Sequence, residues 1–445
     1  MAHPKDGRTR RAWRLNGDVT CREPLASAPA MADVQPLRAV HYDLATAAAL
    51  GDFAAPPYDV IDAEQRAALV ARSPHNVVEI DLPTGDQPYA HAAELYQAWQ
   101  RSGVLVRDAE PALWALEQAY RGPDGGPRTR RGFFARVRVE EYGAGRIRPH
   151  ERTHPGPRED RLALTRATRA NLSPIFSLYS DPSAAAWQAL APATSAAPWG
   201  EVTDADGTRH QLWRCGDQAA IEQVQRTLAG GELLIADGHH RYETARVYAE
   251  EIGGEGDHRY VLMCLVALED PGLTIFPTHR LVRGLDAARR GALAAAIERD
   301  FVTTPVPREQ LAPEPSVGPL ELGYVDSERT LRLTLRDQAI ADAALADMPP
   351  PYRRLDTGVL EALVLKGALG LSDEDISQLH DFGYARDAAQ ALELVESGEY
   401  DAAFLLRATP VEQVREVAAA GFNMPPKSTY FFPKVLTGLV MNPLA

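Results

Sequence analysis

The chain has 445 residues, of which 45% are hydrophobic, so it can bury a large core and is expected to fold as two or three lobes. Its formal net charge of −14 argues against a nucleic-acid partner, because affinity for a duplex depends on basic side chains that neutralise phosphates.

Cysteine usage and hydropathy point to the cytoplasm. Three widely spaced cysteines without a Cys-x-x-Cys motif indicate neither a disulfide framework nor a cysteine-based zinc site. No apolar run approaches the roughly 18 residues of a membrane span, and the N-terminus lacks the apolar stretch of a signal peptide.

Residues 1–32 are rich in basic residues and have few periodic apolar positions, unlike the rest of the chain. This pattern predicts a disordered basic tail. An overextended gene start is the alternative, because Met31 directly precedes the first segment with an ordered pattern.

Residues 33–300 alternate short apolar runs with amphipathic helices, which predicts a main α/β domain. Apolar spacing places Ala92, Tyr96 and Trp99 on one face of a helix at 89–102. Strands at 113–120 and 132–139 are joined across Gly-Pro-Asp-Gly-Gly-Pro, which is typical of a hairpin. Further strands are expected at 77–80 and 274–282, and further helices at 158–169, 217–229, 239–252 and 286–299.

The alternation of strands and helices restarts after a proline-rich stretch at 305–318, so residues 301–445 are expected to form a C-terminal α/β lobe. The expected elements are a hairpin of 320–324 with 331–335, helices at 354–369, 386–397 and 411–420, and a strand at 401–406. The mixed order of hairpins and crossovers favours an α+β protein with mixed sheets and packed helices over a doubly wound sheet.

A strand-to-helix junction at residues 233–246 is the best candidate for an anion site. A buried apolar strand ends at Asp237, Gly238 lets the backbone turn sharply, and helical spacing follows. The first N–H groups of such a helix have no intrahelical partner and the helix dipole adds positive charge, so phosphate binds there readily. His239, His240 and Arg241 add donors at the same place. A glycine turn with solvated polar side chains is the simpler interpretation.

The segment 237–243, Asp-Gly-His-His-Arg-Tyr-Glu, resembles the nucleotide-phosphate motif of the ParB/sulfiredoxin superfamily. Sulfiredoxins carry Gly-Cys-His-Arg, ParB proteins Gly-Glu-Arg-Arg, and free serine kinases Asp-Gly-His-His-Arg. Because His239 stands where sulfiredoxin has its nucleophilic cysteine, the resemblance implies kinase-like chemistry. It also implies a ParB/sulfiredoxin-like nucleotide site that uses ATP or ADP with Mg²⁺.

Four other segments resemble a widespread bacterial family of unknown function, domain of unknown function 1015. They are Ala-Pro-Pro-Tyr-Asp-Val-Ile at 55–61, Arg-Pro-His-Glu-Arg-Thr at 148–153, Asn-Leu-Ser-Pro-Ile-Phe at 171–176 and Met-Pro-Pro-Lys-Ser-Thr-Tyr at 424–430. The chain is identified as a member of that family over nearly all residues after 32. The family supplies no established reaction, so the function must be inferred from the site.

Residues 150–154, His-Glu-Arg-Thr-His, match the zinc-protease pattern His-Glu-x-x-His. Zincin chemistry requires a continuous helix. Prolines on both sides of this segment limit any helix there to one turn. We therefore predict no metal ligand here. His150, Glu151 and Thr153 are instead expected to bind ligand from a polar loop, with an ordinary surface loop as the alternative.

Residues 421–428, Gly-Phe-Asn-Met-Pro-Pro-Lys-Ser, fall one residue short of a Walker A loop. Pro426 occupies the second glycine position and has no N–H to offer a phosphate, and no helix pattern follows, so a P-loop is rejected. Lys427, Ser428 and Thr429 can still supply charge and hydroxyls to a phosphate held elsewhere, and an ordinary turn is the alternative.

A rigid Pro-Pro turn precedes Tyr58 and Asp59, which are candidate substrate-binding residues. Asp62 and Gln65 match a capping box, which leaves Asp59 available for other work. The charged residues of the helix at 158–169 are expected to form a solvated, ion-paired face.

The leading hypothesis is a nucleotide-dependent phosphotransferase acting on a hydroxyl-bearing metabolite, as the resemblance to free serine kinases implies. Gly238, His240 and Arg241 would hold phosphate, and Asp237 would bind metal or accept the substrate proton. The catalytic candidates are Asp237, His239, Glu151 and Glu79. The alternatives are a non-catalytic nucleotide-binding scaffold and a metal-dependent hydrolase. The expected partners are a nucleotide and a small substrate, with no nucleic acid and no membrane, and the chain is a monomer or a homodimer.

Overall fold

The computed structural model describes residues 32–45, 49–123, 125–141, 146–150, 155–314 and 318–444, with the backbone alone at 155–157. All of these belong to one compact unit, Met31–Ala445. Residues 1–31 of the predicted tail lie outside the described residues, and the division of the chain at residue 300 stays a prediction.

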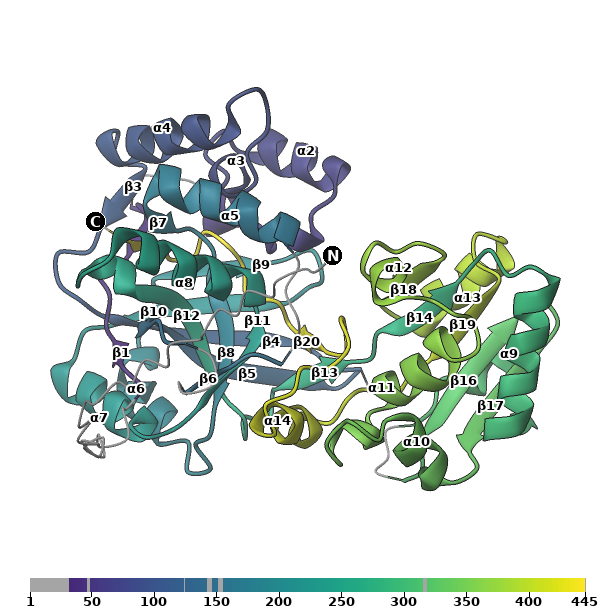
Figure 1. The fold of residues 1–445 in the computed structure, drawn as a ribbon. Coiled ribbons are helices and arrows are strands. Elements are labelled where there is room, and N and C mark those ends of the chain that lie inside the picture. The colour runs from purple at the N-terminus through teal and green to yellow at the C-terminus, as the bar shows by residue number, and fades with distance from the viewer. Residues whose placement is uncertain are drawn as a thin grey trace, which may run out of the picture. The chain divides into compact units, whose positions relative to one another are not determined.

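A nine-stranded mixed sheet organises the described part of residues 34–267 (Figure 1). Its order is β6 (Ile147–Arg148), β11 (Leu233–Asp237), β8 (Ile175–Tyr179), β12 (Tyr260–Ala267), β5 (Pro127–Arg138), β4 (Leu113–Arg121), β10 (Arg209–Cys215) and β9 (Gly200–Thr203), and β1 (Val34–Gln35) pairs with β5. The β6–β11 and β8–β12 pairs are parallel, and the other pairs are antiparallel.

Both faces of this sheet are buried. Phe133 belongs to a core that includes α6 (Ala185–Thr194) and α7 (Gln218–Leu228), whereas Phe134 belongs to a core that includes α4 (Pro88–Arg101) and residues near the C-terminus. Adjacent residues of one strand point to opposite faces, so Phe133 and Phe134 of β5 enter different cores. The other elements of this part are β2 (Val40–Tyr42), β3 (Leu105–Arg107), β7 (Ala170–Asn171), β21 (Asn442–Pro443), α1 (Leu50–Phe53), α2 (Ala63–Arg72), α3 (Val78–Asp81), α5 (Pro155–Thr168) and α8 (His239–Ile252).

A second, six-stranded sheet is antiparallel throughout. Within the described residues its order is β15 (Phe301–Pro305), β17 (Thr330–Leu335), β16 (Glu321–Asp326), β19 (Ala402–Leu405), β14 (His279–Val282) and β18 (Phe382–Ala385). Its helices are α9 (Ala287–Asp300), α10 (Gln338–Ala344), α11 (Asp356–Leu360), α12 (Asp373–Ser377) and α13 (Ala388–Glu396), and α11 continues as a π-helix at Glu361–Lys366. The predicted α+β class, with a mixed main sheet and packed helices, is confirmed.

The chain returns to the first sheet after β19. The helix α14 (Val411–Ala419) contributes Val414 and Val417 to the same core as Phe134. The strand β20 (Tyr430–Phe432) pairs with β13 (Thr274–Phe276), and β21 pairs with β7. Phe431 of β20 lies in that core too, so the segment between α14 and β20 begins and ends beside the first sheet.

Two predicted strands are wrong in detail. Residues 78–80 belong to the helical turn α3 and Val77 precedes it, because the Asn76 side chain accepts a hydrogen bond from the Val78 N–H at 3.1 Å and so begins a turn. The strand predicted at 274–282 is two strands, β13 and β14, which separate at Pro277 because proline cannot donate to a strand ladder. Both predicted hairpins are confirmed.

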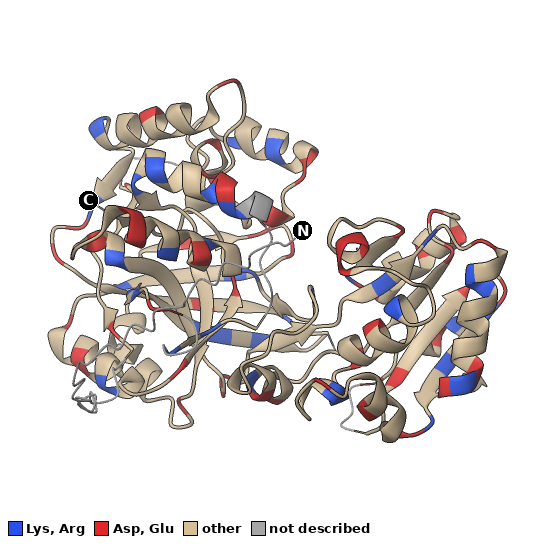
Figure 2. Cartoon of the chain, in the orientation of Figure 1, with Lys and Arg blue, Asp and Glu red and all other residues tan. Residues whose placement is uncertain are grey.

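Charge is spread over the described elements of both sheets (Figure 2). No helix in the described part of the chain is long and apolar enough to cross a membrane.

Candidate functional site

The turn between β11 and α8 needs a glycine for two reasons. Gly238 has a φ of 95°, which strains any residue with a side chain. A Cβ atom there would also lie 2.9 Å from Nε of Arg241, whose side chain folds back over the turn. The first hydrogen bond of the helix runs from the Tyr242 N–H to the Gly238 carbonyl at 3.0 Å. The N–H groups of residues 239–241 therefore have no acceptor within the helix and point out of its N-terminal end. The predicted strand, turn and helix are confirmed.

Asp237 lies among cations at the end of β11. Its Oδ2 is 3.5 Å from Nη2 of Arg241 and 3.5 Å from Nζ of Lys434. Burial raises the pKa of the Asp237 carboxyl, but the charges of Lys434, Arg241 and Lys427 outweigh burial and hold that pKa well below its ordinary value. Asp237 is therefore ionised at neutral pH.

The guanidinium of Arg241 lies between the turn and an aromatic ring. It donates to the carbonyl of Pro174, and its centre is 6.0 Å from the Tyr58 ring. Its Nε is buried and has no hydrogen-bond partner in the described part of the chain. Burial raises the pKa of the Tyr58 hydroxyl to about 12, so the ring stays neutral at physiological pH. The structure thus brings the predicted substrate residue Tyr58 to the predicted phosphate residue Arg241.

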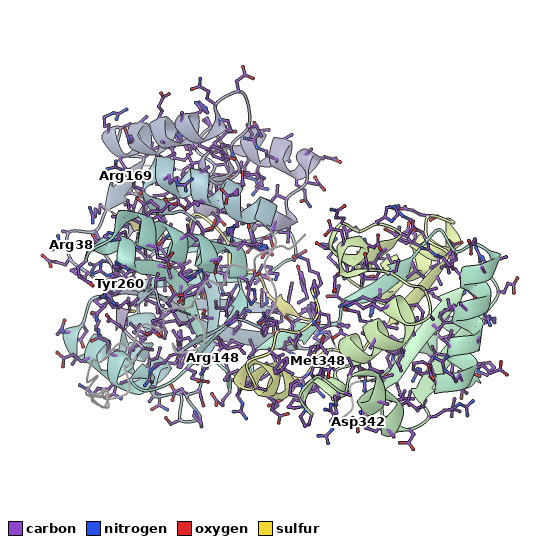
Figure 3. All side chains as sticks on the ribbon, in the orientation of Figure 1. Arg38, Arg148, Arg169, Tyr260, Asp342 and Met348 are labelled. Carbon is purple, nitrogen blue, oxygen red and sulfur yellow. The ribbon has the colours of Figure 1, made fainter. Side chains whose placement is uncertain are left out.

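Two histidines from distant parts of the sequence meet beside the turn. His150, two residues after Arg148 at the end of β6 (Figure 3, where Arg148 is labelled), has its ring 4.6 Å from that of His239. The His150 N–H donates to Nε2 of His239 at 3.3 Å, so this nitrogen of His239 acts as an acceptor. Nδ1 of His150 faces the Ile235 carbonyl and must donate to it, so in a neutral ring Nε2 accepts from the Thr429 hydroxyl at 2.8 Å. The His150 ring therefore binds neighbouring protein groups rather than standing in the geometry of a zinc ligand.

The predicted phosphate residues 427–429 differ in exposure. Lys427 is exposed and has a φ of 55°, whereas Ser428 and Thr429 are buried. The Ser428 hydroxyl donates to the Pro425 carbonyl at 2.7 Å and lies 3.0 Å from the Thr357 hydroxyl, which is a structural use. A strand, β20, follows instead of a helix, so the rejection of a P-loop is confirmed.

The other predicted site residues differ in their surroundings. Glu79 on α3 pairs with Arg66 of α2 at 3.5 Å. Asp59 is exposed, while Asp62 forms the predicted capping box with Gln65. His240 is half-buried at the start of α8. Glu151 and Thr153 lie outside the described residues.

Sequence reasoning missed two residues. Lys434 was not considered, although the chain contains only four lysines and two of them, Lys427 and Lys434, lie seven positions apart. Arg161 was predicted to lie on a solvated face, which is wrong: it is 5% exposed, donates to the Asp81 carbonyl at 2.6 Å, and lies 4.2 Å from the centre of the Tyr58 ring. One arginine among several on a charged helix carries no sequence signal of burial.

The described residues contain no group of three or more His, Cys, Asp or Glu side chains placed to hold a metal ion. Of the His-Glu-x-x-His pattern, only His150 is described.

The chain belongs to the DUF1015 family, proteins of unknown function, whose family model matches residues 34–358. No curated protein matches the chain. Its fold is similar to that of a mutant free serine kinase in complex with AMP, at 14% identity over 64% of this chain and 84% of that chain, with a TM-score of 0.35.

Two other solved structures are similar. A conserved hypothetical protein from Pyrococcus furiosus is 15% identical over 66% of this chain and 92% of that chain, with a TM-score of 0.34. SbnI from Staphylococcus aureus, with a C-terminal truncation, is 11% identical over 68% of this chain and 85% of that chain, with a TM-score of 0.36. A further free serine kinase structure holds ADP.

Proposed function

We propose that the protein is a nucleotide-dependent phosphotransferase that acts on a hydroxyl-bearing small metabolite. One observation carries the proposal: the start of α8, Arg241 and Lys434 surround the ionised Asp237 with positive charge. The resemblance of residues 237–241 to the motif of free serine kinases supports the same assignment.

Phosphate groups of ATP or ADP would bind at the N-terminus of α8. Helix N–H groups and the helix dipole favour an anion there, and Gly238 lets the Arg241 side chain lie over the turn. His240 and Arg241 would add charge-assisted hydrogen bonds, and Lys427 would add its charge. Thr429 would not donate to the phosphate, because its buried hydroxyl donates to Nε2 of His150.

Asp237 is better suited to bind a metal cation than to accept a proton from the substrate. A carboxylate whose pKa is held far below neutral is a weak general base, because a proton acceptor works best with a pKa near the working pH. Its single carboxylate fits Mg²⁺, which commonly takes one or two protein carboxylates and completes its shell with phosphates and water. Bound Mg²⁺ would neutralise charge on the transferred phosphoryl group.

The substrate hydroxyl then needs a different base. Glu151 follows His150, which contacts His239, so Glu151 is our first candidate. His239 would orient the reacting groups, and Tyr58, Asp59 and Thr153 would bind the substrate. The predicted substrate role of His150 is not kept, because its ring is buried and both ring nitrogens bond Ile235 and Thr429; it would hold His239 in place instead. Glu79 ranks below Glu151 because Arg66 pairs with it.

Calorimetric titration of ATP and ADP, with and without Mg²⁺, tests the proposal on two variants. Arg241→Ala should weaken nucleotide binding about tenfold or more, because a hydrogen bond to a charged group contributes about 1.5–3 kcal/mol. Asp237→Asn should retain binding of ADP without Mg²⁺ and lose phosphoryl transfer to serine-like metabolites.

Arg246→Ala is the matched control, because Arg246 lies on the same helix and pairs with Glu243 at 2.8 Å, away from the turn. It should bind nucleotide like the wild type. Unchanged affinity in Arg241→Ala would remove the phosphate assignment, and tight binding without transfer would favour a nucleotide-binding scaffold.

A further inference from the structure

The segment Met424–Lys434 carries half of the lysines in the chain. Only four of the 47 basic residues are lysines, and Lys427 and Lys434 are two of them. Lysine offers a compact ammonium with three rotatable donors, whereas arginine offers a planar fork. Both of these lysines lower the pKa of the Asp237 carboxyl, so two scarce point charges act on one acid.

The backbone at Lys427 is held by a buried arginine of the second sheet. Arg280 on β14 is 3% exposed, and its guanidinium donates to the carbonyls of Lys427 and Pro426, each at 3.1 Å. Lys427 has a φ of 55°, a conformation that a residue with a side chain keeps only when its surroundings impose it. The Thr409 hydroxyl also donates to the Ser428 carbonyl, at 2.9 Å.

The backbone at Lys434 is held by a second buried arginine, on the first sheet. Arg130 on β5 is 1% exposed, and its guanidinium donates to the Pro433 carbonyl and to Oε1 of Gln118. No carboxylate pairs with Arg130 within the described ranges. Burial lowers the pKa of Arg130 to about 10, so it stays charged at neutral pH.

Arg130 also decides which way the Gln118 amide points. A guanidinium only donates, so the Gln118 oxygen must face Arg130 and its nitrogen must face away. That nitrogen donates to the Lys434 carbonyl at 3.0 Å and lies 3.1 Å from Nδ1 of His210. His210, Gln118 and Arg130 stand opposite one another on the neighbouring strands β10, β4 and β5.

We propose that Arg280, and Arg130 together with Gln118, are positioning residues that fix the backbone under Lys427 and Lys434, so that both ammonium groups bind one anionic ligand beside Asp237. The identity of that ligand as a nucleotide phosphate rests on the proposed function. The positioning itself rests on the hydrogen bonds of Arg280, Arg130 and Gln118 to the backbone of the segment. Through these hydrogen bonds, the second sheet fixes the backbone at Lys427 and the first sheet fixes the backbone at Lys434.

Amine labelling tests the Lys434 half without any nucleotide. Brief reaction of the full chain with acetic anhydride, followed by mass spectrometry, reports each lysine, and Lys366, which pairs with Glu361 at 2.6 Å, is the internal reference. Gln118→Glu keeps an acceptor for Arg130 but loses the donor to the Lys434 carbonyl. We expect the labelling of Lys434 relative to Lys366 to rise at least about threefold, because its ammonium leaves Asp237.

Two further variants serve as controls for this labelling experiment. Gln118→Met removes the same donor without adding charge and should have the same effect. Arg136 lies on the same strand as Arg130 and pairs with Asp257 at 2.6 Å. Arg136→Gln should therefore leave the labelling of Lys434 as in the wild type. Unchanged Lys434 labelling in both Gln118 variants, with wild-type melting temperatures, would overturn the proposal.

A double-mutant cycle tests the Lys427 half. ADP affinity is measured for Arg280→Gln, Lys427→Met and the double variant. If Arg280 acts through Lys427, the double variant binds no more weakly than Lys427→Met, and Arg280→Lys recovers part of the loss. Additive losses would overturn the positioning role. Absence of nucleotide binding by the wild type would instead contradict the proposed function, and the labelling result would still decide the positioning.

Discussion

Asp237 combines two opposing influences on a single carboxyl. Burial alone would favour its neutral form, while Lys434, Arg241 and Lys427 favour the charged form and outweigh burial. The same cations would attract a phosphate, so an arriving anion competes with Asp237 for its partners unless a divalent cation joins them. This competition is the physical reason to expect Mg²⁺-dependent binding.

Substitution of Gly238 tests the turn at the residue scale. Gly238→Ala should lower the free energy of unfolding by about 1–3 kcal/mol and displace Arg241, since it adds backbone strain and a Cβ atom 2.9 Å from the Arg241 Nε. Denaturant unfolding and ADP titration measure the two effects.

Gly253→Ala is the control, because Gly253 follows the other end of α8 with a φ of 70° and nothing within 4 Å of its Cβ position. Gly253→Ala should lower the free energy of unfolding through backbone strain alone and should bind ADP with wild-type affinity. Equal ADP affinity in the two variants would separate Gly238 from the anion site.

At the scale of elements, local signals predicted what local chemistry decides. The capping box of Asp62, both hairpins and the strand-turn-helix at Gly238 follow from residues within a few positions of one another. The helical turn at Val78–Asp81 was predicted as a strand although its signal is also local. A short apolar run suits either a strand or a buried turn, and the contact of Asn76 with the Val78 N–H distinguishes them.

Only the part of the candidate site that is contiguous in sequence was predicted. The β11–α8 junction was found because all its residues lie together. Lys434 and Arg161 were missed because their roles depend on contacts with Asp237 and Tyr58, which are far away in sequence. Long-range packing decides those positions.

The start of α2 offers a test at the element scale. Asp62→Ala should lower the free energy of unfolding by about 1 kcal/mol, because the Gln65 N–H loses its acceptor at 2.8 Å. Asp59→Ala, three residues earlier, alters an exposed side chain and should leave stability within about 0.5 kcal/mol of wild type. Thermal unfolding compares the two, and a loss in Asp59→Ala as large as that in Asp62→Ala would refute the assignment of the cap.

Acid should weaken the whole molecule through a buried histidine. Burial lowers the pKa of His279 to about 4, and the charge of Arg280 adds to this effect. The unfolded chain binds a proton at this position below about pH 6.5, whereas the folded chain does not until about pH 4, so stability is full above pH 6.5 and falls between these values by roughly 3 kcal/mol.

His279→Gln should flatten the loss between pH 6.5 and pH 4 in urea titrations. His380→Gln, at a side chain that is 71% exposed, should keep the wild-type profile. The histidine explanation is wrong if His279→Gln loses as much stability over this range as the wild type.

The order of strands in the second sheet bears on how the protein can be trimmed. β19 lies between β16 and β14, and β14 between β19 and β18, although β18 and β19 come late in the sequence. A fragment that ends at residue 358, where the family match ends, would lack both strands and leave β14 without a neighbour in its sheet. It would also lack Lys427 and Lys434. The stretch by which relatives are recognised is thus not a self-sufficient folding unit, and fragments for expression should extend to the last strand, Asn442–Pro443.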